Sequence, residues 1–261
     1  MRQFSAEYLE ATRAGMWADS RSALEPLALA SRERILDVGA GTGELTAVLG
    51  AESSGEVVAC DADPRLLSHV PGPVVQADAT RLPVVDDGVD LVVCQALLVN
   101  LADPDAAIRE FTRVSSDLVA AIEPDNSEVS LTSTVDAEAP LARRARERYL
   151  GGVATDATLG SVATKFREAG LADVEVRRYD HVRTVEPPYD ERDLEAARRK
   201  ASGAGLAADR AQILAGETTV AEYERLREDW REMGRAVVAQ MEAGDYRRRE
   251  VVPFYVTVGR V

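Results

Sequence analysis

Apolar residues recur along this 261-residue chain in short uninterrupted runs, and from residue 34 these runs alternate with amphipathic stretches. Uninterrupted apolar runs are typical of strands that are buried on both faces of a parallel sheet. The pattern therefore predicts an α/β fold with a doubly wound, mostly parallel sheet. The expected strands cover residues 34–38, 56–60, 73–76, 89–95 and 117–122, and the expected helices between them cover 43–51, 63–69 and 104–114.

The second half of the chain continues the alternation but carries an insertion. Helices are expected at 137–149 and 159–169, a sixth strand through Val174 and Val176, and a seventh at 251–259. Pro253 has no N–H to donate, so we expect it at the start of that strand or at a bulge. Between the last two strands the chain inserts roughly residues 186–247, with helices expected at about 190–202 and 219–242.

The first 30 residues precede the first strand and read as helical, over 5–19 and 21–30. They either cover an edge of the sheet or form a lid in which Tyr8, Arg13 and Trp17 face a ligand pocket. The predicted organisation is thus an N-terminal helical lid (1–30), a core (31–185 and 248–261) and a helical cap insertion (186–247).

The charge balance is acidic, with 45 Asp and Glu against 31 Lys and Arg and a net charge of −14. Lys165 and Lys200 are the only lysines. A GC-rich genome favours arginine over lysine but does not explain the acidity, so we favour a protein from a salt-adapted, halophilic archaeon. Salt screening would relieve the self-repulsion, so stability should rise with molar salt. The same charge disfavours nucleic acid as the main partner.

The chain has no apolar run long enough for a membrane span, and its N-terminus lacks the apolar segment of a secretory signal. We therefore expect a cytoplasmic protein. Cys60 and Cys94 lie on expected strands that another strand separates, which is too far for a disulfide. Free buried thiols are expected, and the paired spacing of a metal site is missing.

The segment Ile35–Thr46, ILDVGAGTGELT, runs from a strand through a turn with three alternating glycines into a helix. Glycine lets the backbone turn sharply and approach a ligand closely, and the helix N-terminus attracts a polar group. Asp61 ends the second strand and Asp78 follows the third, at the same sheet edge as the turn. There Asp61 can accept ribose hydroxyls and Asp78 an exocyclic amine.

These motifs in this order, DVGAGTGEL, the acid after strand two, ADATRLP and VDLVVCQALLVNLADPDAAIREFTRV, resemble those of class I S-adenosylmethionine-dependent methyltransferases. The resemblance is specific over residues 34–124. It implies a seven-stranded Rossmann-like sheet that an antiparallel hairpin completes, with S-adenosylmethionine as cofactor. By this resemblance the cofactor-binding residues are Asp37, Gly39, Ala40, Gly41, Gly43, Asp61, Ala62, Asp78, Ala79 and Gln95.

The favoured function is methyl transfer to a small-molecule acceptor by in-line displacement. The resemblance assigns no catalytic residue, because amines and thiolates can react without a base. A nicotinamide-dependent dehydrogenase is less consistent with the sequence, since Glu44 stands where the GxGxxG pattern needs its third glycine. A non-catalytic cofactor-binding protein or an interaction scaffold also stays open.

Two groups of residues are candidates for acceptor contact. Glu123, Asp125 and Asn126 follow the fifth strand, where they form either a polar loop or an acceptor-orienting group. Tyr223, Trp230 and Met233 lie on the apolar stripe of the second inserted helix, where core packing is the default interpretation. The two histidines, His69 and His181, read as structural. The sequence predicts neither the acceptor nor the oligomeric state.

Overall fold

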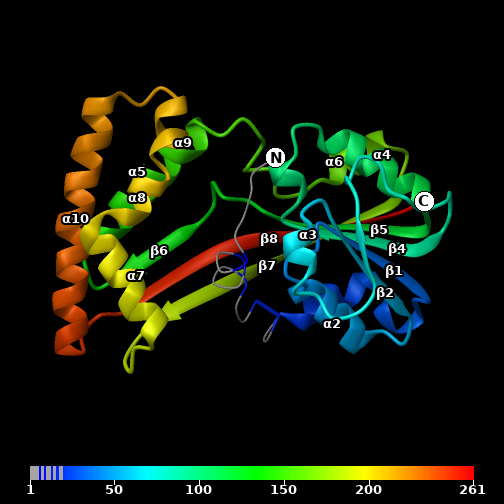
Figure 1. Cartoon of the computed structure of the whole chain (residues 1–261), viewed down its shortest axis with the longest axis horizontal. Coiled ribbons are helices and arrows are strands. Elements are labelled where there is room, and N and C mark those ends of the chain that lie inside the picture. The colour runs from blue at the N-terminus through cyan, green and yellow to red at the C-terminus, as the bar shows by residue number, and fades with distance from the viewer. Residues whose placement is uncertain (1–5, 7–8, 10–12, 14–15, 18–19) are drawn as a thin grey trace. The chain divides into compact units, whose positions relative to one another are not determined.

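The computed structural model describes residues 6, 9, 13, 16, 17 and 20–261 (Figure 1). Most of the helix expected over 5–19, including Tyr8, lies outside the described residues. The described part contains one eight-stranded sheet in the order β3-β2-β1-β4-β5-β8-β6, with β7 paired to β8. The strands are β1 (Arg34–Val38), β2 (Glu56–Asp61), β3 (Val74–Gln76), β4 (Val89–Gln95), β5 (Ser115–Pro124), β6 (Ser130–Ser133), β7 (Ala172–Val185) and β8 (Arg248–Arg260).

The five strands β1 to β5 pair in parallel, and β1 lies between β2 and β4. Their apolar side chains are buried on both faces, as the uninterrupted runs predict. Figure 1 shows α4 (Pro104–Val114) and α6 (Ala163–Glu168) on one side of these strands and α2 (Glu44–Glu52) on the other. The doubly wound, mostly parallel fold class is therefore confirmed.

The far edge of the sheet departs from the expected seven strands. β8 runs antiparallel to β5 from Phe254 onward and antiparallel to β6 up to Val251. The additional strand is β6, which the sequence pattern did not predict. Pro253 lies inside β8, between these two paired segments, and not at the start of the strand. The missing N–H thus falls where the strand changes partners.

Two helix predictions near the ends of the core were wrong in extent. Residues 21–30 form two 3₁₀ turns, Arg21–Leu27 and Leu29–Ser31, which the left-handed residue Ala28 separates. α6 begins at Ala163 instead of 159, because Gly160 is left-handed and donates its N–H to the Pro124 carbonyl at 3.2 Å. That hydrogen bond ties the preceding turn to the end of β5.

The chain divides into two compact units. The first comprises residues 1–126, 155–181 and 253–261, and the second comprises 127–154 and 182–252. Beyond the predicted insertion, the second unit takes in residues 127–154 with all of α5 (Glu138–Gly151). Its other helices are α7 (Glu191–Ser202), α8 (Ala204–Ala208), α9 (Arg210–Ala215) and α10 (Val220–Ala243).

The core of the second unit is apolar and well packed. Tyr223, Leu226, Met233 and Val237 from α10 are buried there with residues of α5, α8 and α9. Gly234 allows α10 to approach α7 closely, since a Cβ there would lie 2.3 Å from the backbone nitrogen of Ala201. The stripe on α10 is therefore a packing surface of this unit.

No helix in the described part of the chain combines the length and the apolar character needed to cross a membrane. Cys60 and Cys94 are buried free thiols on β2 and β4, as predicted. Burial raises the pKa of Cys60 to about 12 and that of Cys94 well above its usual range, so both thiols stay protonated at neutral pH.

Candidate functional site

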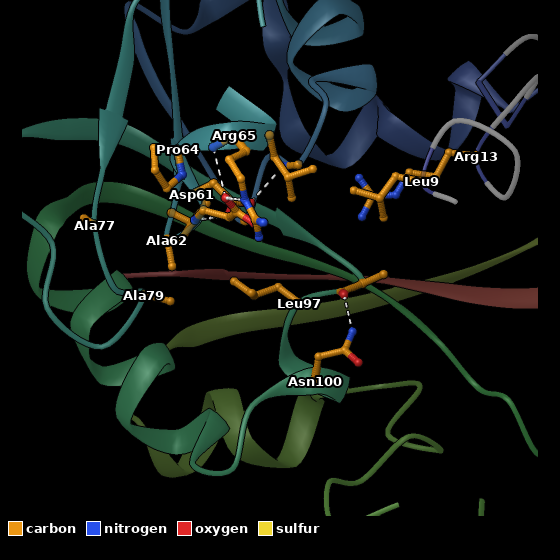
Figure 2. Close-up of a pocket in the computed structure, with 16 residues that line it drawn as sticks. Leu9, Arg13, Asp61, Ala62, Pro64, Arg65, Ala77, Ala79, Leu97 and Asn100 are labelled. Carbon is orange, nitrogen blue, oxygen red and sulfur yellow. Dashed lines mark hydrogen bonds and ion pairs between the residues drawn. The ribbon is translucent and has the colours of Figure 1, made fainter. Parts of the chain in front are cut away.

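A cavity of about 350 Å³ opens at the carboxyl ends of β1, β2 and β4 (Figure 2). This is within the range of small-molecule and cofactor sites, roughly 300–1,000 Å³. All of its lining residues belong to the first unit. Figure 2 shows Ala77 and Ala79 at one end of the cavity and Leu9 and Arg13 at the other. The lining residues are Leu9, Arg13, Val38, Gly39, Gly41, Asp61, Ala62, Asp63, Pro64, Arg65, Leu66, Ala77, Ala79, Ala96, Leu97 and Asn100.

The glycine turn after β1 forms one wall. Gly39, Gly41 and Gly43 all adopt left-handed conformations, with φ of 73°, 58° and 90°. The backbone N–H groups of Gly39 and Ala40 donate to the Cys60 carbonyl at 2.7 and 3.0 Å, so the turn is tied to the end of β2. Gly39 and Gly41 line the cavity, whereas Ala40 and Gly43 support the turn from behind.

Asp61 lies beside this turn, as the sequence predicts. One carboxylate oxygen accepts the Gly41 N–H at 2.9 Å and the other accepts the Asp63 N–H at 2.9 Å. Each carboxylate oxygen has a second lone pair, so the group can still accept hydroxyl donors from the cavity. Ala62 follows it along the same wall.

The next residues along the chain were not predicted as site residues. Asp63 caps α3 (Pro64–Leu67) and holds the Arg65 guanidinium through two hydrogen bonds of 2.9 and 2.7 Å. That pairing lowers the pKa of Asp63, so both side chains are charged and mutually satisfied. A signal was present, because DADPR combines a helix cap with a following proline directly after a strand.

The segment after β3 contributes small residues. Ala77 and Ala79 line the cavity, whereas Asp78 is exposed and is absent from the lining. The Asp78 carboxylate accepts the backbone N–H and the hydroxyl of Thr80, and these bonds lower its pKa. An adenine contact by Asp78 stays a prediction.

The segment after β4 forms the wall opposite Asp61 in a way that sequence reasoning missed. Gln95 is buried outside the lining and donates its amide N–H to the Met16 sulfur. Ala96, which has a positive φ of 48°, and Leu97 and Asn100 take its place. The Leu97 side chain packs closely on Gly39: a Cβ atom at position 39 would lie only 2.8 Å from the Cδ1 atom of Leu97.

Arg13 reaches the cavity from the N-terminal segment, and its side chain is 9% exposed. Its guanidinium lies 3.7 Å from the Glu44 carboxylate and 3.5 Å from the Gln95 carbonyl oxygen. Both contacts, which are those to described residues, are long. Trp17, by contrast, is buried against Tyr179 with ring centroids 5.5 Å apart and is not among the lining residues.

Asp37 lies beneath the glycine turn and is 1% exposed. One of its carboxylate oxygens accepts the Thr46 hydroxyl at 2.6 Å, and the other has no partner among the described residues. Burial raises the pKa of Asp37 to about 6. It braces α2 and does not line the cavity directly.

The three acceptor candidates at the end of β5 and just after it have different surroundings. Glu123 is fully buried, and its carboxylate accepts backbone N–H groups of the segment after β4. Asn126 donates to the Ala157 carbonyl at 2.6 Å, and Asp125 is half-buried. None of the three lines the cavity, and acceptor contact by any of them stays a prediction.

In the second unit, Tyr223 and Met233 are buried in the apolar core and Trp230 packs against it. The Tyr223 hydroxyl donates to the Leu206 carbonyl at 3.0 Å. These contacts account for the stripe by packing alone, and acceptor contact by the three residues stays a prediction. Among the described residues, no group of three or more His, Cys, Asp and Glu is arranged to hold a metal ion.

Residues 36–117 match a family model described as a methyltransferase domain. A demethylmenaquinone methyltransferase of Corynebacterium urealyticum is 40% identical over 92 residues, covering 34% of this chain and 40% of the relative. A ubiquinone/menaquinone biosynthesis C-methyltransferase of Vibrio vulnificus is 36% identical over 95 residues, covering 31% and 36%. The match thus spans about two fifths of the length of these relatives.

Solved structures extend the similarity of fold beyond that segment. The YcgJ protein of Bacillus subtilis aligns with a TM-score of 0.51 at 13% identity, over 92% of this chain and 98% of that one. Phosphoethanolamine N-methyltransferase 2 of Haemonchus contortus aligns with a TM-score of 0.51 at 14% identity, over 97% of this chain and 58% of that one. Residues 36–117 therefore belong to a methyltransferase domain, within a fold that the chain shares with class I S-adenosylmethionine-dependent methyltransferases. S-adenosylmethionine is the cofactor of this class.

Proposed function

We propose that this protein transfers the methyl group of S-adenosylmethionine to a small-molecule acceptor by in-line displacement. The cavity at the carboxyl edge of β1, β2 and β4 is the observation that carries this proposal. It joins a left-handed glycine turn, an acid at the end of β2 and a wall of small residues after β3. These features match the elongated shape and mixed polarity of the cofactor.

The residues of the cavity suggest how the cofactor lies. Asp61 would hold the ribose hydroxyls, and Ala62, Ala77 and Ala79 would leave room for the flat adenine ring. The methionine part would follow the glycine turn, where Gly39 and Gly41 present backbone instead of side chains. The sulfonium of the bound cofactor supplies an electrophilic methyl group.

The chain contributes to such a reaction mainly by holding the acceptor atom in line with the methyl carbon. Alignment of this kind can lower a barrier by several kcal/mol, up to about 7–11 kcal/mol in well-oriented systems. The lining acids are already bonded, Asp61 to two backbone N–H groups and Asp63 to Arg65. We therefore assign no general base, and an acceptor that is nucleophilic when it binds suits this site.

Quinone precursors are the first acceptor class to test. The relatives are named for methylation of demethylmenaquinone and of ubiquinone or menaquinone precursors. The apolar lining contributed by Leu9, Leu66 and Leu97 is compatible with an aromatic acceptor near the donor. A small amine or thiol is the second class, because the domain alone does not define the acceptor.

Two measurements test the proposal. Calorimetry should show binding of S-adenosylmethionine and S-adenosylhomocysteine but not of NAD. Incubation with methyl-labelled S-adenosylmethionine and a panel of hydroxynaphthoquinones, amines and thiols should then label one acceptor. Failure to bind the cofactor would reject the proposal, and binding without transfer to any acceptor would favour the non-catalytic binding protein.

We further infer that the acidic, lysine-poor composition reflects adaptation to salt, as in a halophilic archaeon. The support is the net charge of −14, with two lysines in 261 residues. A cytoplasmic location, the exclusion of nucleic acid as a partner and the division into lid, core and cap stay predictions.

A further inference from the structure

The Glu123 carboxylate, fully buried at the end of β5, accepts hydrogen bonds from three backbone amides and one thiol. One of its oxygens accepts the N–H groups of Leu97 and Leu98 at 3.0 and 2.9 Å, and the other accepts the N–H of Val99 at 3.3 Å. The Cys94 thiol donates to the same carboxylate at 3.7 Å. Three consecutive backbone amides therefore converge on one side chain.

The backbone that Glu123 holds is part of the cofactor cavity. Leu97 lines the cavity and packs on Gly39, and Ala96 and Asn100 line it on either side. The Asn100 side chain closes the turn by donating to the Ala96 carbonyl at 2.9 Å (Figure 2). Since Ala96 has a positive φ, this turn is strained and needs contacts from outside itself to persist.

We propose that Glu123 is a positioning residue for cofactor binding, which holds the Leu97–Val99 backbone so that Leu97 and Asn100 face the cavity. This inference rests on the proposed function, since it assigns the wall to the cofactor site. Glu123 itself does not line the cavity, so it acts through the turn and not by touching the ligand.

The carboxylate is suited to this task because it is an acceptor only. An ionised carboxylate presents two oxygens with four lone pairs, enough for three amides and a thiol. A protonated carboxyl or an amide would turn one of these positions into a donor that opposes an N–H group. Among the described ion pairs none includes Glu123, so the amides are its main source of stabilisation.

The titratable groups around Glu123 are few. Cys94 faces it from β4, and Asp37 on β1 acts on Cys94 in turn. On the antiparallel side its register partner on β8 is Tyr255, over whose ring the Arg178 guanidinium lies at 5.9 Å. The turn itself carries no charged side chain from Leu97 to Asn100. Burial raises the pKa of Glu123 to about 7, so the carboxyl group changes between its protonated and ionised forms near neutral pH.

The test compares Glu123→Gln with Glu110→Gln. Glu110 on α4 also binds a backbone N–H, that of Leu82 at 2.7 Å, but Leu82 does not line the cavity. S-adenosylhomocysteine affinity is measured by calorimetry from pH 6 to 8.5. Amide hydrogen exchange of residues 97–99 is followed without ligand, and thermal unfolding shows that both variants are folded.

Glu123→Gln should lower the affinity for S-adenosylhomocysteine by about tenfold at pH 8, which is the loss expected for one or two hydrogen bonds to a charged group. It should also speed exchange at residues 97–99, whereas Glu110→Gln should change neither. The affinity of the unsubstituted protein should fall as the pH drops below about 7, and that of Glu123→Gln should not.

The outcomes separate the two proposals. If the unsubstituted protein does not bind S-adenosylhomocysteine, the proposed function fails, and the role in cofactor binding fails with it. If it binds, but Glu123→Gln retains full affinity at every pH and unchanged exchange at residues 97–99, only the role of Glu123 is overturned. Equal losses in Glu123→Gln and Glu110→Gln would also overturn it, because the effect would then not be specific to the cavity wall.

Discussion

The Asp61 carboxylate accepts the backbone N–H of Gly41 at 2.9 Å, which links the acid at the end of β2 directly to the glycine turn after β1. The same side chain accepts the Asp63 N–H, so it orders the start of the next turn as well. A residue expected only to bind ribose hydroxyls therefore also shapes the site that it lines.

Substitution of Asp61 should reveal both roles. Asp61→Asn keeps one oxygen acceptor but places an amide donor against a backbone N–H, and it removes the charge that would favour ribose hydroxyls. We expect S-adenosylhomocysteine affinity to fall by tenfold to a hundredfold, about 1.4–2.8 kcal/mol. Calorimetry measures the affinity, and thermal unfolding measures the effect on the turn.

Asp63→Asn is the matched control for this prediction. Asp63 also lines the cavity, but its carboxylate is occupied by Arg65. We therefore expect a smaller loss of affinity for Asp63→Asn. Equal affinities of Asp61→Asn and the unsubstituted protein would contradict the ribose assignment.

A methyl group added at Gly39 should damage the site. Gly39 has a φ of 73°, and a Cβ there would lie 2.8 Å from Leu97 Cδ1. Left-handed backbone costs a residue with a Cβ about 1–2 kcal/mol, and Leu97 would also have to move. Gly39→Ala should therefore lower the melting temperature and weaken the binding of S-adenosylhomocysteine.

Gly50→Ala provides the comparison on the same stretch of chain. Gly50 is exposed inside α2, where a Cβ would meet no atom within 4 Å. Alanine there should stabilise the protein by roughly 0.5–1 kcal/mol and leave cofactor affinity unchanged. Two alanine variants with the same stability and affinity would argue against a special role for Gly39.

The core elements could be predicted from sequence because local signals determine them. The expected bounds of β1, β4 and α4 agree with the structure. β1 and β4 are apolar runs that need burial, and α4 begins where Asp103 caps a helix with proline at its first position. The place of Asp61 also followed from the sequence, since the carboxyl ends of parallel strands share one edge.

The remaining features depend on contacts between residues distant in sequence. Glu123 reads as one acid in a polar stretch, yet the backbone amides that it binds lie 24 to 26 residues earlier in the chain. From the sequence, Trp17 belongs either to a helix that covers the sheet edge or to a lid, and its ring packs on Tyr179. Neither contact has a periodic signature, so hydrophobic patterning could not predict it.

Stability should fall as the pH rises from about 4 to 7. Burial raises the pKa of Asp37 to about 6 and that of Glu123 to about 7. In this window the folded protein holds protons that the unfolded chain has released, so ionisation favours unfolding. Acids with lowered pKa values, such as Glu138 and Glu250, contribute the opposite trend below that window.

Asp37→Asn isolates one of these groups, since an amide oxygen can still accept the Thr46 hydroxyl. Urea unfolding measures the free energy of unfolding of both proteins. From pH 4 to pH 7, the stability of Asp37→Asn relative to the unsubstituted protein should increase by on the order of 2–3 kcal/mol. Glu175→Gln, which changes an exposed acid on β7, should show no such increase in relative stability over the same pH range. A constant difference between Asp37→Asn and the unsubstituted protein across this range would refute the assignment.

The net charge of −14 predicts that salt stabilises the fold. Screening shortens the range of like-charge repulsion to about 10 Å at 0.1 M and about 3 Å at 1 M salt. Most of the relief should therefore occur below about 1 M potassium chloride, and the melting temperature should rise steeply there and then level off. A rise that continues linearly to 3 M would instead indicate exclusion of salt from the protein surface.

A variant with reduced charge separates these causes further. Glu195, Glu224 and Glu228 are exposed on α7 and α10, and their replacement by glutamine leaves the apolar core untouched. If screening of self-repulsion is the cause, the triple variant should be more stable than the unsubstituted protein at 0.1 M salt and gain less on addition of salt. An unchanged melting temperature between low and molar salt would reject salt adaptation, because 45 acids against 31 bases would then carry no measurable penalty at low salt.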